Sequence, residues 1–245
     1  MKYFVLFFKI LFLIWTAVWF VFWMILFSPF MMIPILISDR AGRFSFIFIR
    51  LWATLWGYMS GIRFKTYGKE VINLSQPYIY TINHTSYLDA PAIPAAVPQQ
   101  LRALGKHELG KIPLFGWIVG RFAVWVDRTN PASRLKSIDK LKNVLAKGIS
   151  ILIAPEGTRN NTKNTLLPFK NGAFKLAIET QTPILPMVIL HANKLMPRGT
   201  FFLKPGVISI YFSEPIPVSG LSLEDVDQLK EKVYNRMEAM ILTHE

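Results

Sequence analysis

An apolar run gives way abruptly to polar residues in Tyr78-Ile79-Tyr80-Thr81-Ile82-Asn83-His84-Thr85-Ser86-Tyr87-Leu88-Asp89. The first five residues are β-branched or aromatic and follow the turn-forming Ser75-Gln76-Pro77, which predicts a buried strand. His84 lies just beyond the end of that strand, and Asp89 lies five residues further along. A turn or short helix in this interval would fold the carboxylate back onto the imidazole.

A paired histidine and carboxylate can act as a general base, because the carboxylate holds one tautomer of the ring and stabilises the imidazolium. Histidine titrates near about 6.5, so it performs this chemistry at neutral pH. The spacing alone is weak, since four His and six Asp in 245 residues give about a one-in-ten chance of such a pair. Taken alone, the pair is better explained as an ordinary cap at a helix start. Ser86 is too close to His84 on the same turn to complete a Ser-His-Asp triad, so we interpret it as a turn residue.

A second buried strand is predicted over Ile149-Ser150-Ile151-Leu152-Ile153-Ala154, and it ends in Pro155-Glu156-Gly157-Thr158-Arg159. A specific pentapeptide arises by chance in a chain of this length with a probability on the order of 10⁻⁴. Together with His84-x4-Asp89, it resembles the glycerolipid acyltransferase family. The resemblance covers about residues 77–186 and is carried by these two motifs.

The resemblance implies transfer of an acyl group from acyl-CoA or acyl-ACP to the sn-2 hydroxyl of lysophosphatidic acid, giving phosphatidic acid. His84 would be the base and Asp89 the carboxylate that orients it. No cofactor or metal is implied, since the acyl thioester is a co-substrate. Several further positions match those that the family uses to bind the phosphate of the acceptor: Arg128, Glu156, Gly157, Thr158, Arg159 and, less directly, Lys106 and Lys170.

Four departures from the family pattern leave the acceptor open: Ala154, Asn160, Phe122 and Thr182. Glycerol 3-phosphate or another lysolipid is therefore an alternative acceptor.

The charge pattern offers an alternative function of a different class. Residues 101–175 contain fourteen Lys and Arg against four acids, a net charge of +10 within a total of +13, and such a region suits an anionic substrate, a membrane surface or nucleic acid. A membrane-tethered nucleic-acid-binding protein would leave the His84–Asp89 spacing unexplained, so no nucleic acid partner is expected.

The composition argues against cysteine chemistry and against a metal site. The chain contains no Cys, which excludes a thiol nucleophile and disulfides. The four histidines show none of the clustered spacing typical of a metal site, so none is expected.

The N-terminal segment is strongly apolar. Residues 10–37 carry no charge, and the first 18 of them would form a helix of about 27 Å, close to the hydrocarbon thickness of a bilayer. A second apolar stretch spans residues 44–59, and basic residues flank both stretches. Because this charge distribution is not asymmetric, we favour a helical hairpin that dips into one leaflet over a single span. The implied location is the bacterial inner membrane, with the catalytic domain on the cytoplasmic side and membrane lipid as a partner.

The remaining pattern alternates strands with helices, which predicts an α/β fold with a mixed, mainly parallel sheet flanked by helices. Asn130 and Pro131 begin one helix, with an apolar stripe formed by Leu135, Ile138, Leu141 and Leu145. We expect two parts, a membrane-associated segment over 1–61 and a catalytic domain over 62–245. In such sheets binding sites collect beyond the strand ends, where His84, Arg128 and Glu156 fall.

Overall fold

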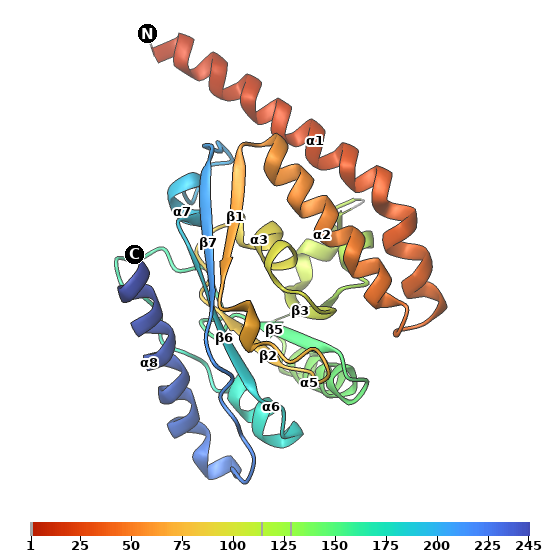
Figure 1. The fold of residues 1–245 in the computed structure, drawn as a ribbon, viewed down its shortest axis with the longest axis vertical. Coiled ribbons are helices and arrows are strands. Elements are labelled where there is room, and N and C mark those ends of the chain that lie inside the picture. Colours follow the sequence, from red (N-terminus) through yellow and green to blue (C-terminus); the bar gives the residue numbers. More distant parts are fainter. Residues whose placement is uncertain (1, 114, 128) are drawn as a thin grey trace.

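The computed structural model describes residues 2–113, 115–127 and 129–245 and shows a seven-stranded sheet with helices on both faces (Figure 1). The strands lie in the order β1-β7-β6-β2-β5-β3-β4. Their bounds are β1 Ile62–Tyr67, β2 Ile79–Ile82, β3 Leu101–Lys106, β4 Ala123–Val126, β5 Ser150–Ile153, β6 Ile184–Leu190 and β7 Gly206–Phe212. The α-helices are α1 Lys2–Ile37, α2 Gly42–Met59, α3 Asp89–Ala96, α4 Phe115–Val119, α5 Pro131–Ala146, α6 Gly172–Thr180, α7 Ala192–Leu195 and α8 Val226–His244, and the 3-10 turns are η1 Lys69–Val71, η2 His107–Lys111 and η3 Leu223–Asp225.

The sheet is mainly parallel, as predicted. Strands β6, β2, β5, β3 and β4 all run in the same direction, whereas β7 is antiparallel to β6, and β1 is parallel to β7. The carboxyl ends of the five parallel strands therefore meet at one edge. The segments that carry His84 and Glu156 both leave the sheet at this edge, after β2 and β5.

The central strands are buried on both faces, which explains their unbroken apolar sequences. Every residue of β2, β5 and β6 is buried. One face of the sheet packs against α5, α6 and α8, and the other packs against α2 and α3. These two apolar layers hold the strand ends in a fixed position relative to one another.

Helix α5 begins as predicted, but its apolar stripe is only partly correct. The Asn130 side chain accepts a hydrogen bond from the Ser133 amide (3.2 Å), and Leu141 and Leu145 are buried. Leu135, however, is 66% exposed. The buried face of this helix is formed by Ser137, Leu141 and Leu145. Leu135 precedes Ser137 by two residues, so its side chain points about 200° away from Ser137 around the helix axis.

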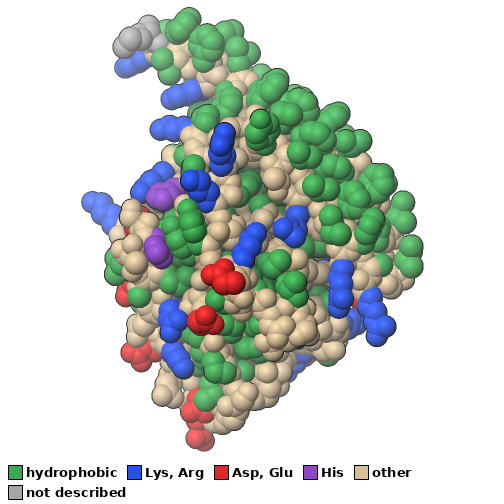
Figure 2. Space-filling model, viewed as in Figure 1, with side chains coloured by type: hydrophobic (Ala, Val, Ile, Leu, Met, Phe, Trp, Pro, Cys, Tyr) green, Lys and Arg blue, Asp and Glu red, His purple; other side chains and the backbone are tan. Residues whose placement is uncertain are grey.

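The two N-terminal helices form a hairpin in which α1 packs along α2 (Figure 1). Three tryptophan indoles join them: Trp15 donates to the Met59 carbonyl (2.9 Å), Trp52 to Phe20 (3.2 Å) and Trp56 to Thr16 (3.0 Å). The outer side of α1 is a continuous apolar surface (Figure 2). Within the described residues, α1 is the one helix that is long and apolar enough to cross a membrane, and 11% of its most apolar window is buried.

Asp39 connects the turn of this hairpin to the sheet. Its carboxylate contacts Lys147 Nζ (2.5 Å) and the guanidinium of Arg102 (3.7 Å). Its backbone carbonyl accepts a hydrogen bond from the side-chain amide of Gln100 (3.2 Å). Arg102 is buried at the start of β3, and this burial lowers its pKa, whereas the charge of Asp39 raises it. Asp39 is the only acidic partner of this buried guanidinium among the described residues.

We expect Asp39→Asn to destabilise the protein, because it removes the counter-charge of a buried Arg102. The expected loss is about 1–3 kcal/mol, less than for a fully buried pair because the carboxylate is partly exposed. Asp227→Asn is the matched control, since Asp227 pairs with Lys230 at the surface, where solvent screens the two charges, and its loss should change stability much less. Urea unfolding followed by tryptophan fluorescence measures both, and equal effects would show that Arg102 does not depend on Asp39.

Candidate active site

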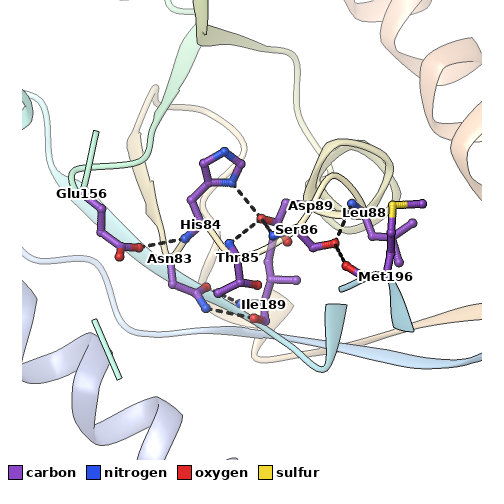
Figure 3. Close-up of polar contacts among 9 residues, drawn as sticks. All are labelled: Asn83, His84, Thr85, Ser86, Leu88, Asp89, Glu156, Ile189 and Met196. Carbon is purple, nitrogen blue, oxygen red and sulfur yellow. Dashed lines mark hydrogen bonds and ion pairs between the residues drawn. The ribbon is translucent and has the colours of Figure 1, made fainter. Parts of the chain in front are cut away.

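The structure brings His84 and Asp89 together as the spacing predicts. His84 Nδ1 lies 2.8 Å from Asp89 Oδ2, and the same oxygen accepts from the backbone amides of Thr85 (2.9 Å) and Ser86 (3.0 Å) (Figure 3). Asp89 is buried at the first turn of α3, where the helix dipole favours a negative charge. Because the carboxylate accepts, Nδ1 carries the proton and Nε2 is left as the basic nitrogen.

The imidazole is held at the protein surface rather than inside it. The His84 side chain is 33% exposed, and its Nε2 points away from Asp89 (Figure 3). Within the described residues, Nε2 has no hydrogen-bond partner. A substrate hydroxyl can therefore reach the nitrogen that would take its proton.

Ser86 faces a different partner, as expected for a turn residue. Its hydroxyl donates to the Met196 carbonyl (3.0 Å) and accepts from the Leu88 amide (3.3 Å). No hydrogen bond joins Ser86 to the imidazole in the described residues. The arrangement is a His-Asp pair, and among the described residues no hydroxyl is hydrogen-bonded to the imidazole.

Glu156 holds the histidine segment from the neighbouring strand. One carboxylate oxygen accepts from the His84 amide and the other from the Leu167 amide, each at 2.9 Å. The amide of Asn160 in turn donates to the His84 carbonyl (2.6 Å). The carboxylate is buried, and burial raises its pKa above the usual 4.5, although the two backbone hydrogen bonds oppose the shift. Both carboxylate oxygens therefore accept hydrogen bonds from the backbone. The resemblance implies a different role for Glu156, namely binding the phosphate of the acceptor.

The rest of the Pro155–Arg159 turn presents its polar groups outward. Gly157 has φ +73°, a backbone conformation that favours glycine, and the Lys170 side chain lies over it, 3.0 Å from where a β-carbon would be. The Lys170 amide donates to the Pro155 carbonyl (2.9 Å). Thr158 is exposed. The structure therefore places Lys170 beside the turn that carries Gly157 and Thr158, next to the His84 segment.

The Arg159 guanidinium lies over the ring of Tyr87, 3.8 Å from its centroid. The other stacking partner of Tyr87 is Phe201, with centroids 5.7 Å apart. Sequence analysis gave Tyr87 no role, although it lies inside the His84–Asp89 interval. The one feature in the sequence that could have drawn attention to Tyr87 is its position, as an aromatic residue between His84 and Asp89.

One predicted phosphate-binding residue, Lys106, makes no contact with the Pro155–Arg159 turn among the described residues. Lys106 ends β3 at the same edge of the sheet, but it is exposed and pairs with Glu108 (2.9 Å). Arg128 lies outside the described residues. As for metals, the described residues include no group of three or more His, Cys, Asp or Glu side chains able to hold an ion.

The raised pKa of Glu156 predicts a pH-dependent contribution to stability. The folded protein retains the Glu156 proton at pH values where the unfolded chain has released it, so this contribution is present at low pH and is lost as pH rises from about 4.5 through the folded-state pKa. Glu156→Gln cannot titrate. We expect the stability of the wild type relative to this variant to fall as pH rises, measured by urea unfolding from about pH 4 to about pH 7. Parallel pH profiles would contradict the assignment.

Comparison with known proteins identifies the family of this chain. The protein-family model described as Acyltransferase matches residues 63–190 of this chain. The chain is 30% identical over 184 residues to human 1-acyl-sn-glycerol-3-phosphate acyltransferase alpha, covering 74% of this chain and 64% of that protein. It is also 30% identical over 188 residues to the human beta enzyme, covering 76% and 67%.

The fold has a close counterpart among solved structures. The crystal structure of the 1-acyl-sn-glycerophosphate (LPA) acyltransferase PlsC from Thermotoga maritima superposes with a TM-score of 0.82 over 97% of both chains, at 23% identity. This likeness concerns the fold. The protein-family model, by contrast, covers more than half of the chain and contains both the His84–Asp89 pair and the Pro155–Arg159 turn. On that basis, this chain belongs to the acyltransferase family.

Proposed function

We propose that this protein transfers an acyl group from a thioester, acyl-CoA or acyl-ACP, to the sn-2 hydroxyl of lysophosphatidic acid. The observation that carries the proposal is the 2.8 Å contact between His84 Nδ1 and Asp89 Oδ2, which leaves Nε2 accessible. Relatives named 1-acyl-sn-glycerol-3-phosphate acyltransferase support this choice of acceptor. Glycerol 3-phosphate and other lysolipids are the competing acceptors.

In the proposed reaction His84 acts first as a base and then as an acid. Nε2 takes the proton of the acceptor hydroxyl while its oxygen attacks the thioester carbonyl. The tetrahedral intermediate collapses with cleavage of the carbon–sulfur bond, and the imidazolium returns its proton to the departing thiolate. The buried Asp89 carboxylate stabilises the imidazolium between these two steps.

Phosphate binding is assigned to the groups on the Pro155–Arg159 turn and beside it. The Arg159 guanidinium can bind phosphate through two parallel hydrogen bonds, and Lys170 adds a charge close by. Glu156 is better suited to a positioning role, because its carboxylate would repel a phosphate and already accepts two backbone amides. It sets the position of the His84 backbone relative to this turn.

We assign the hairpin of α1 and α2 to membrane association within one leaflet, at the cytoplasmic side of a bacterial inner membrane. The exposed apolar side of α1 supports contact with lipid, since apolar surfaces of this size are rare on soluble monomers (Figure 2). Trp15 of α1 lies near the edge of the sheet where β2 and β5 end, because its indole bonds to the Met59 carbonyl next to the start of β1. A lipid acceptor could then approach His84 from the bilayer.

His84→Ala should reduce acyl transfer to lysophosphatidic acid by about 10²–10⁴-fold, the usual contribution of a general base. Ser86→Ala is the matched control, and its activity should stay within a few-fold of wild type because its hydroxyl contacts Met196 and not the imidazole. The rate is measured with acyl-CoA in detergent micelles, with thermal unfolding to show that both variants are folded. An active His84→Ala protein would refute the mechanism, and faster transfer to glycerol 3-phosphate would refute the acceptor.

The stack of Arg159 on Tyr87 predicts a second effect. Tyr87→Leu removes the ring and should raise the KM for lysophosphatidic acid by about 3- to 30-fold, in line with a cation–π interaction of about 0.5–2 kcal/mol. Tyr87→Phe keeps the ring face and should change this KM little. The KM for acyl-CoA should be the same in all three proteins. Equal KM values for the acceptor in the Leu and Phe variants would exclude a positioning role for the ring.

A further inference from the structure

A pocket of about 710 Å³ opens at the opposite edge of the sheet from His84. It lies where the turn between α1 and α2 meets the residues that precede β2, β3 and β5, among them Gln76, Gln100 and Ile149. The catalytic pair follows the carboxyl end of β2, whereas this pocket is next to its amino end. The pocket is therefore separate from the proposed catalytic site.

The pocket is strongly basic. Four cationic side chains line it, Arg40, Arg43, Arg50 and Lys147, against one carboxylate, Asp39. That carboxylate is already used, since it pairs with Lys147 and with the buried Arg102 outside the pocket. Among the described residues, no acidic side chain forms an ion pair with any of the three pocket arginines.

The positive charge of Arg50 also acts on Lys69, a residue outside the pocket. The pKa of Lys69 is lowered, first by burial and then by the positive charge of Arg50. Arginines that line one pocket without an acidic partner among the described residues are expected to attract an anion. Guanidinium groups are particularly suited to phosphate, which they bind through paired hydrogen bonds.

The rim of the pocket indicates which kind of phosphate compound fits. Ile47 and Leu74 line the pocket and are 51% and 64% exposed. Directly before the turn, Leu36 and Ile37 continue the exposed apolar side of α1. A soluble anion would gain nothing from these apolar surfaces, whereas an amphiphile would place its phosphate among the arginines and its chains against the apolar residues.

We propose that this pocket binds the headgroup of an anionic phospholipid. Basic pockets beside membrane helices bind such headgroups by the same combination of charge and apolar contact. The protein would then contact the bilayer in two ways, through lipid phosphate at the turn of the hairpin and through the exposed apolar side of α1. With both contacts made, the domain cannot rotate freely about α1, and the edge of the sheet that carries His84 keeps a constant orientation to the bilayer.

The test measures lipid binding without an acyl donor, so it is independent of catalysis. Full-length protein in neutral detergent micelles is titrated with fluorescent phosphatidylglycerol and with fluorescent phosphatidylcholine. The wild type should prefer phosphatidylglycerol, and Arg40→Gln/Arg43→Gln/Arg50→Gln should weaken that binding by about 150-fold, since each of the three basic residues near an anionic surface contributes about 1 kcal/mol.

A matched variant removes the same charge elsewhere. Arg134→Gln/Lys136→Gln/Lys140→Gln alters three exposed basic residues of α5 and should bind phosphatidylglycerol like the wild type. Equal loss in the two triple variants would indicate only a diffuse charge effect and overturn the proposal, as would full binding by the arginine variant. Displacement of the lipid by free glycerol 3-phosphate at a similar concentration would assign the pocket to a soluble anion instead.

Discussion

The backbone of His84 leaves β2 inside the protein, and its amide and carbonyl must find partners away from water. Glu156 accepts the amide and Asn160 donates to the carbonyl. Both partners come from the segment after β5, the adjacent strand. The two motifs, more than sixty residues apart in sequence, are thus one structural unit, and neither can take its conformation without the other.

This dependence explains why the carboxylate of Glu156 is buried despite the cost of desolvation. A neutral side chain of similar size could satisfy only one of its two amide partners, because an amide group carries donors as well as an acceptor. The same need for an acceptor recurs at Asp89, where one oxygen receives two backbone amides and the imidazole. Two buried carboxylates therefore set the backbone of the turn and the tautomer of the ring.

Much of the fold could be predicted from the sequence, because it rests on local patterns. The apolar strands, the Asn130 cap and the spacing of His84 and Asp89 are all visible within a few residues. The partners of Glu156 could not be predicted, since a motif gives residue types and not the atoms that they contact. Leu135 was misassigned because apolar spacing fits several faces of a helix, and packing selects one of them. The residues that line the basic pocket come from four segments that are far apart in the sequence. No local sequence pattern therefore indicates the pocket.

The two edges of the sheet differ in the chemistry they present. The carboxyl edge carries an accessible imidazole and a turn with outward polar groups, whereas the amino edge carries unpaired arginines beside an apolar helix. The hairpin extends from one edge to the other. Its helices are joined by indole-to-carbonyl hydrogen bonds, and such bonds persist in hydrocarbon, where apolar helix surfaces gain nothing from avoiding water. In the proposed membrane association, the two helices would therefore enter lipid already joined to each other and would not need to repack.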